Sequence, residues 1–425
     1  MSVIKLTRER KGRGLTFFSK TLILLAFILI FVLLFRQMNS FLCVSQPINS
    51  RALVVEGWLP DYSLEHLIRH IEENKIEKII LTGVPLERGY YNSRYQTYAD
   101  VAMVSLSGMG FDTTRIRKVN LPANISRDRT YTAALALRQE IENGNIELQG
   151  FNIYTLGCHA RRSWLLFRKA FDGSMPIGII SSRDESYDYD HWMASSRGFR
   201  TVTNEGIAYL YAALSFIPDD EGIRRQLEEG HYLDSLRDHR SRINKSFTDS
   251  LHTPLTKEQL EDFIGLNYFE PDPGFRVRAA YRIDTSGTPF QMKTTTDRLP
   301  TYRKYARLDF ELKEQEFSLN AYQNMAFIDH PEYHDYLFLP MRDLSSGEES
   351  YGGGRYLDLQ IRDQDSIWLD FNFLYNPYCS YNGRYSCPIP RQKTTLRSKS
   401  WPGKNLILII NKIKNDGSTK DKIRY

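Results

Sequence analysis

Residues 151–171 read FNIYTLGCHARRSWLLFRKAF, and this stretch decides how the first half of the chain folds. Its first six residues form a short apolar run that is typical of a buried strand, and residues 161–171 are predicted to form a helix. The polar residues His159, Arg161 and Arg162 lie at the junction. A strand that runs directly into a helix is the repeating unit of parallel α/β sheets.

The same alternation continues on both sides of this stretch. Apolar runs that predict strands lie at 52–56, 78–83, 116–121 and 176–181, and helices are expected at 61–73, near 98–107 and from Asp128 or Thr130 onward. We therefore expect an α/β domain over residues 51–216, in which a parallel sheet has helices on both faces.

Candidate site residues occur where the predicted strands end. In such sheets, ligands bind beyond the carboxyl ends of the strands, beside the N-termini of the helices. Glu56 and His159 are the candidates for acid–base catalysis. The candidate ligand-binding residues are Gly83, Arg129, Thr130, Arg161 and Arg162. Two arginines in a first helical turn oppose the helix dipole, and a bound anion would compensate them.

Each of these residues also has a purely structural interpretation. Asp128 or Thr130 would serve as a helix cap, the two arginines would be solvated, and His159 would be a packed histidine. In the anion-site interpretation, one of the two arginines is expected to point into the crevice with His159, and the other to brace the sheet edge or reach the same ligand.

Several motifs in this region resemble one known family. The motifs are ALVVEGWLPDYSLEHLI, IILTGVPLERGY, RDRTYTAALALR, YTLGCHARRSWLLFRKAF and SSRGFRTVTNEGIAYLYA. Together they are similar to the ElyC/SanA/YdcF envelope proteins over roughly residues 51–215. The resemblance implies a Rossmann-like fold, a single transmembrane anchor and a role in envelope and peptidoglycan integrity, without an established reaction. The family's glycine-rich turn after the first strand is replaced here by Glu56-Gly57-Trp58. No G-x-G-x-x-G motif or P-loop occurs, which disfavours a nicotinamide-type cofactor, and the cofactor question stays open.

The N-terminal segment is long and apolar enough to be a membrane anchor. Residues 15–35 read LTFFSKTLILLAFILIFVLLF, and about 20 apolar residues span a bilayer. The alternative is a cleaved signal peptide, whose apolar region is usually about 7–15 residues long. Five basic residues precede the span, so we expect a cytoplasmic tail (1–14), a transmembrane helix (15–36) and a periplasmic remainder at a bacterial inner membrane.

The charge distribution argues against nucleic-acid binding. The chain has 56 basic and 51 acidic residues, a net charge of +5, but the first 20 residues contain six of the basic and one of the acidic residues. The remaining 405 residues therefore hold 50 of each sign. A nucleic-acid binder would concentrate basic charge on a folded face.

The second half of the chain has a different pattern. Residues 217–262 are rich in charges and predict an exposed helical linker. From Gly274 onward apolar residues alternate with period two, as in 308–312, 317–321, 357–361 and 367–371, and the run LILII at 406–410 closes the set. This pattern predicts a β-rich domain over residues 263–413, either a sandwich or a small barrel. Residues 414–425 are expected to form a tail.

This half contains two dense polar motifs, SYGGGRYLDL (350–359) and LDFNFLYNPYCSYNGRYSCPIPR (369–391), and the segment HTPLTKEQLEDFIGLNYF. These three stretches resemble domain of unknown function 1684, and the resemblance covers about residues 231–410. Members usually continue with a Pro, an Asn and a Gly-Glu, where this chain has Arg391, Thr394 or Thr395, and Gly403-Lys404. The resemblance implies no established reaction.

The β-rich half contains a second set of candidate residues. Arg355, Asp370, Asn372 and Asn376 are expected to converge on a polar ligand, or else to form a buried Arg–Asp network. Cys379 and Cys387 predict a disulfide in an oxidising compartment rather than a metal site, since suitably spaced further ligands are lacking. His330 and His334 are four apart, but Pro331 makes a helical metal site improbable.

These observations predict a membrane-anchored periplasmic protein of envelope biogenesis. Its α/β domain is expected to bind an anionic, phosphate-bearing small molecule or lipid-linked precursor. The alternative is a non-catalytic scaffold or sensor whose β-rich domain docks envelope proteins such as cell-wall enzymes. A catalytic site predicts one crevice that holds both Glu56 and His159, whereas a scaffold predicts an exposed apolar patch on the β-rich domain.

Overall fold

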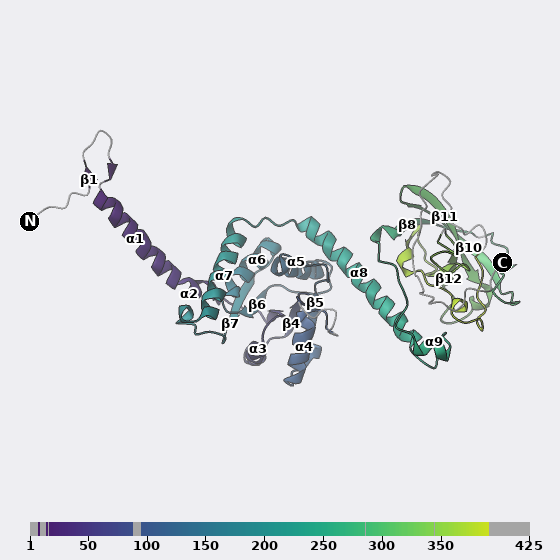
Figure 1. Cartoon of the computed structure of the whole chain (residues 1–425), viewed down its shortest axis with the longest axis horizontal. Coiled ribbons are helices and arrows are strands. Elements are labelled where there is room, and N and C mark those ends of the chain that lie inside the picture. The colour runs from purple at the N-terminus through teal and green to yellow at the C-terminus, as the bar shows by residue number, and fades with distance from the viewer. Residues whose placement is uncertain are drawn as a thin grey trace, which may run out of the picture. The chain divides into compact units, whose positions relative to one another are not determined.

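The computed structural model describes residues 7–8, 14–15, 17–87, 95–284, 286–343 and 345–390. The chain divides into two compact units, residues 1–231 and 232–425, and the boundary falls within the long helix α8 (Asp220–Phe247). Each unit is built around its own sheet, as Figure 1 shows.

The expected apolar helix lies near the N-terminal end of the first unit. Helix α1 (Phe17–Arg36) is, among the described residues, the one helix long and apolar enough to cross a membrane, although a signal sequence has the same character. Before it, the short strands β1 (Thr7–Arg8) and β2 (Gly14–Leu15) pair antiparallel. After it, the short helix α2 (Met38–Leu42) leads into the α/β fold.

A five-stranded parallel sheet forms the centre of the first unit, as the strand–helix alternation predicted. Its strands are β3 (Ala52–Glu56), β4 (Lys78–Gly83), β5 (Ile116–Asn120), β6 (Phe151–Leu156) and β7 (Ile177–Ser182), in the order β5-β4-β3-β6-β7. From β3 the chain first adds β4 and then β5 on one side of β3, and it then adds β6 and β7 on the other side. The strand order therefore reverses between β3 and β6, the place where ligands bind in open α/β sheets.

Helices cover both faces of this sheet (Figure 1). The helices are α3 (Asp61–Glu73), α4 (Tyr98–Gly108), α5 (Arg129–Glu142), α6 (His159–Phe171) and α7 (Ser196–Leu214). On β3, Leu53 and Val55 pack with α3 and α4, whereas Val54 packs with α5 and α6. Successive side chains of a strand point to opposite faces of the sheet, so the central strand β3, which has helices on both faces, is buried along its whole length.

Helix α6 begins at His159, two residues earlier than predicted. Gly157 has a φ of +47°, a left-handed conformation that glycine adopts without steric cost, so the chain turns from β6 into α6 immediately. This earlier start places His159 and Arg162 within the first helical turn.

The second unit contains one curled antiparallel sheet of seven strands. These are β8 (Arg276–Ile283), β9 (Phe290–Gln291), β10 (Thr301–Leu312), β11 (Gln315–Asn324), β12 (Tyr336–Met341), β13 (Arg355–Gln360) and β14 (Ser366–Asp370). The order is β13-β12-β11-β10-β8-β14, and β9 also pairs with β10. The mostly-β expectation is confirmed. The predicted linker is helical, as α8 and α9 (Lys257–Glu261).

The predicted period-two runs form the core of this unit. Leu308, Phe310, Leu319, Leu357 and Leu369 all lie in one buried cluster. Strand β14 ends at Asp370, and the following residues 371–373 form a 3₁₀ turn rather than more strand. The predicted strand 406–410 and the tail 414–425 lie outside the described residues.

Candidate functional site

Glu56 is a buried carboxylate at the carboxyl end of the central strand β3. It is 4% exposed. Its carboxylate accepts a hydrogen bond from the hydroxyl of Thr155 on the neighbouring strand β6. The hydroxyl of Ser163 on α6 lies 3.0 Å from Oε1 and 3.2 Å from Oε2 of the same carboxylate. Burial alone raises a carboxyl pKa, but the nearby His159 charge and these hydroxyls outweigh it, so the pKa of Glu56 is lowered.

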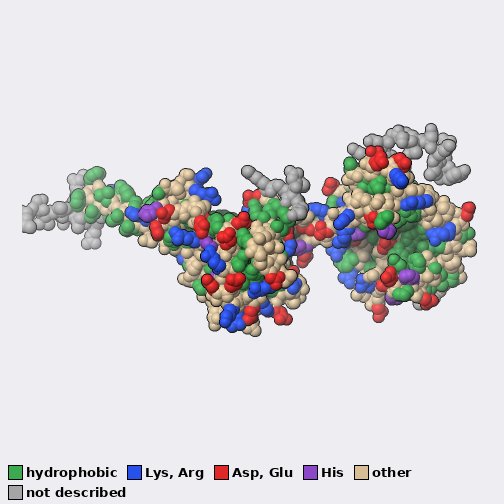
Figure 2. All heavy atoms as spheres, turned by 90° about the horizontal axis from the view of Figure 1, so that it is seen from below, with side chains coloured by type: hydrophobic (Ala, Val, Ile, Leu, Met, Phe, Trp, Pro, Cys, Tyr) green, Lys and Arg blue, Asp and Glu red, His purple; other side chains and the backbone are tan. Residues whose placement is uncertain are grey.

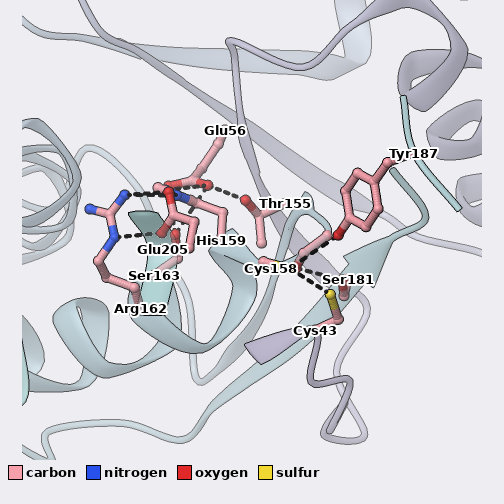
Figure 3. Close-up of polar contacts among 11 residues, drawn as sticks. Cys43, Glu56, Thr155, Cys158, His159, Arg162, Ser163, Ser181, Tyr187 and Glu205 are labelled. Carbon is pink, nitrogen blue, oxygen red and sulfur yellow. Dashed lines mark hydrogen bonds and ion pairs between the residues drawn. The ribbon is translucent and has the colours of Figure 1, made fainter. Parts of the chain in front are cut away.

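His159 lies between two carboxylates (Figure 3). Its Nε2 is 3.6 Å from Glu56 Oε2, and its Nδ1 is 3.1 Å from Oε1 of Glu205 on α7. Arg162, one turn along α6, forms a two-pronged pair with Glu205, in which Nε and Nη2 donate at 2.9 and 3.0 Å. The ring of His159 also packs edge-on against Trp58, with centroids 4.9 Å apart.

These contacts favour the charged imidazole. Burial lowers the pKa of His159, but the charges of Glu56 and Glu205 outweigh burial and raise it to about 9. Arg162 Nη2 also lies 2.9 Å from Nδ1, and two donors cannot share a hydrogen bond. In the charged form, Nδ1–H and Arg162 therefore both donate to Glu205. Burial raises the pKa of Glu205 on its own, yet these cations lower it strongly.

Glu56 and His159 line a single crevice of about 530 Å³, together with Trp58, Arg162 and Glu205. The start of α5 lines the same crevice through Arg129 and Thr130, although Arg129 also pairs with Glu87. The preceding Asp128 is in a left-handed conformation, and its side chain makes no capping hydrogen bond. The first backbone N–H groups of α5 therefore have no side-chain cap, and neither do those of α6.

Two candidate residues of the α/β unit lie elsewhere. Arg161 donates its Nε–H to the carbonyl of Phe41 and stacks over that ring, 3.9 Å from its centroid, and it does not line the crevice. Gly83 serves packing, because a Cβ there would lie 2.7 Å from the Cβ of Ala99 and 2.3 Å from Asn120 Oδ1. Of the arginine pair, only Arg162 reaches the crevice.

A cysteine pair lies beside this cluster. Sγ of Cys43 is 3.1 Å from Sγ of Cys158 (Figure 3). Asn39 Oδ1 accepts hydrogen bonds from Cys158 and from the Tyr187 hydroxyl, both at 2.9 Å. Both cysteines are free thiols in this structure. The contact joins the segment after α2 to the start of α6.

The second set of candidates does not converge as expected. Arg355, 1% exposed, pairs through Nη2 with Asp343 Oδ2 at 2.6 Å rather than with Asp370. Asp370 and Asn372 bind the hydroxyl of Tyr232 at 3.1 and 2.7 Å. Together with Asn376, these two residues line a separate cavity in the second unit. A buried Arg–Asp pair exists, but its partner is a loop aspartate that the motif did not indicate.

Residues 261–400 match the family described as protein of unknown function (DUF1684). We name the second unit the DUF1684 domain after the family that it matches over these residues. The chain is also 32% identical to an uncharacterized protein of Haloarcula marismortui known from a solution NMR structure. That similarity covers 42% of this chain and 96% of the other, with a TM-score of 0.34. No curated protein matches the chain. The resemblance of residues 51–215 to the ElyC/SanA/YdcF proteins stays a prediction.

In the DUF1684 domain, Cys379 and Cys387 lie close together. The backbone N–H of Cys379 donates to Sγ of Cys387 at 3.3 Å, and both are free thiols in this structure. Their disulfide stays a prediction. The departures from the family at Arg391, Thr394, Thr395 and Gly403-Lys404 lie outside the described residues. Within the described ranges, no group of three or more His, Cys, Asp or Glu side chains forms a metal site.

Sequence reasoning missed Glu205, which binds both His159 and Arg162. It lies 46 residues beyond His159, inside the motif SSRGFRTVTNEGIAYLYA, and an acidic residue among the small and apolar residues of that motif was the available signal. Thr155 and Ser163 were also missed. Their positions follow from Glu56, because Thr155 is on the adjacent strand and Ser163 is four residues after His159 on α6.

Proposed function

We propose that the α/β unit binds an anionic, phosphate-bearing ligand in the crevice between β3, α5 and α6, and that the chain is a membrane-anchored periplasmic protein of cell-envelope biogenesis. The observation that supports binding is the pair of helix N-termini at this crevice, both without a side-chain cap. Free backbone N–H groups and the positive end of the helix dipole favour anions.

The charged side chains of the crevice are paired with one another, and the strength of each pair decides which groups can contact the ligand. Arg162 and His159 are balanced by Glu205 and Glu56, so this cluster is close to neutral and does not attract an anion by net charge alone. Arg129 pairs with Glu87, whose side chain is 61% exposed, and such an exposed pair is weak enough for a ligand to displace. His159 Nε2 lies 3.6 Å from Glu56 Oε2, just beyond hydrogen-bond distance, and has no other partner among the described residues, so a ligand oxygen can compete for its proton.

Acid catalysis is a natural extension of this arrangement. An imidazole that stays protonated at neutral pH donates a proton to a leaving oxygen, while Arg162 and Glu205 hold the ring in position. Because Glu56 and His159 share one crevice, the arrangement supports a ligand-binding or catalytic site over a non-catalytic scaffold. The envelope role and the membrane anchor rest on the sequence motifs and on the apolar helix α1.

Calorimetry with pyrophosphate and farnesyl pyrophosphate tests this proposal. Arg129→Gln removes a charge-assisted contact worth about 1.5–3 kcal/mol, so affinity should fall roughly 10- to 100-fold. Arg161→Gln is the matched control, because Arg161 lies outside the crevice, and it should bind like the parent. Equal affinities for the two variants, or no binding by the parent, would contradict the proposal.

A further inference from the structure

The DUF1684 domain contains a cavity of about 760 Å³, within the range of roughly 300–1,000 Å³ usual for small-molecule sites. The end of α8 forms one wall, and residues 356–359 and 368–387 form most of the rest. Its lining is mainly apolar and rich in tyrosine. Trp368 and Tyr378 are 52% and 46% exposed, so the cavity communicates with solvent. Figure 2 shows a hollow in this unit where hydrophobic side chains gather.

Three buried polar atoms from this lining have no hydrogen-bond partner among the described residues. They are Nε of Arg240, the hydroxyl oxygen of Tyr268 and Oδ1 of Asn376. Asn376 is only 4% exposed. An unpaired buried polar atom costs about 1–3 kcal/mol, so three in one cavity indicate that something else supplies their partners.

Arg240 is the cation with unmet hydrogen-bonding capacity. Its Nη1 donates to the carbonyl of Phe269 at 2.9 Å, and its guanidinium lies over the Tyr268 ring, 4.7 Å from the centroid. Within the described part of the chain it has no carboxylate within ion-pair distance. Burial lowers its pKa, which reflects the cost of leaving this charge without a partner.

The acidic residues of the cavity are already occupied. Asp358 accepts hydrogen bonds from the hydroxyls of Tyr336 and Tyr375, each at 2.7 Å. Asp370 accepts from Tyr232 and from the Asn372 side chain. The unmet requirements are therefore an acceptor at Arg240, a partner for the Tyr268 hydroxyl and a donor at Asn376, beside an apolar wall.

We propose that this cavity binds a single-chain amphipathic anion, with an acyl chain against the tyrosine-rich wall and a polar end that carries both a carboxylate or phosphate for Arg240 and a hydroxyl or amide for Asn376. The proposal concerns the DUF1684 domain alone and does not depend on the function proposed for the α/β unit. A purely apolar ligand would leave all three polar atoms unpaired, and a small polar anion would leave the apolar wall exposed.

Photolabelling tests the site directly. The full chain in phosphatidylcholine nanodiscs is irradiated with 3-hydroxytetradecanoate that has a diazirine at the end of its chain, and the labelled peptides are mapped. We expect labels within residues 239–247 or 356–387. Unlabelled 3-hydroxytetradecanoate should compete, its methyl ester should compete at least tenfold less well, and tetradecyl phosphate distinguishes a phosphate from a carboxylate preference.

Two variants on α8 separate a ligand contact from a structural effect. Arg240→Met should raise the concentration for half-maximal labelling by 10- to 100-fold and leave competition by the methyl ester unchanged. Arg242→Met is the matched control, because Arg242 is exposed and does not line the cavity. Asn376→Leu should abolish the preference for 3-hydroxytetradecanoate over tetradecanoate.

Three results would overturn the proposal. Labels confined to α1 would show only partition into the membrane. Equal behaviour of Arg240→Met and Arg242→Met would exclude the guanidinium as a contact. If the methyl ester competes as well as the acid in the unmodified chain, the polar end is not recognised as an anion. This result does not depend on whether the variants fold.

Discussion

The protonation of His159 can be tested through its partner Glu205. The Glu205 carboxylate is 3.1 Å from Nδ1, and together with Glu56 it raises the pKa of His159 to about 9. Glu205→Gln keeps the shape but removes one charge. An opposite charge at this distance changes a pKa by roughly 1–3 units, so the His159 pKa should fall to roughly 6–8.

The raised pKa also sets how stability depends on pH. The folded pKa is about 9, against an ordinary value of 6.5. The difference of roughly 2.5, at about 1.36 kcal/mol per unit, gives roughly 3 kcal/mol. Because the folded value is the higher one, this stabilisation is complete below about pH 6.5 and is lost as the pH rises through 9. The lowered pKa values of Glu56 and Glu205 act oppositely, since their stabilisation is lost on acidification.

Histidine-selective ¹³C NMR measures both effects on the full chain. The resonance assigned by its loss in His159→Gln should titrate near pH 9 in the parent and at lower pH in Glu205→Gln. Asp188→Asn is the matched control, because it removes the carboxylate beside the exposed His191 and should not change the His159 midpoint. A parent midpoint near 6.5, or no change in Glu205→Gln, would refute the charged cluster.

Three further predictions concern topology and cysteines. An alkaline phosphatase fusion at Ser50 should be active, because the basic flank keeps the N-terminus cytoplasmic, and an inactive fusion with an active cytoplasmic reporter would contradict this. Peptide mapping of the oxidised protein should find Cys379 joined to Cys387, a short loop worth roughly 2–3 kcal/mol, and alkylation of both thiols would argue against the bond. The same mapping should find Cys43 joined to Cys158 after mild oxidation, because their sulfur atoms are 3.1 Å apart, and persistent free thiols would exclude that pairing.

The local pattern of the sequence determined the elements and the class of both sheets. Burial alternates with period two along a strand, so runs such as 308–312 identify strands before any partner is known. In the first unit, the ends of the predicted parallel strands also identified Glu56 and His159 as neighbours, because parallel strands end at the same edge of a sheet. Both residues line the observed crevice.

Only the tertiary structure decided which polar groups are partners. Arg161 and Arg162 are adjacent in sequence, but successive helical residues point about 100° apart, and the packing of α6 turns Arg162 toward Glu205 and Arg161 toward Phe41. Arg355 likewise pairs with Asp343 instead of Asp370. Such pairings depend on how whole elements rotate and pack against one another, which neighbouring residues in a sequence do not specify.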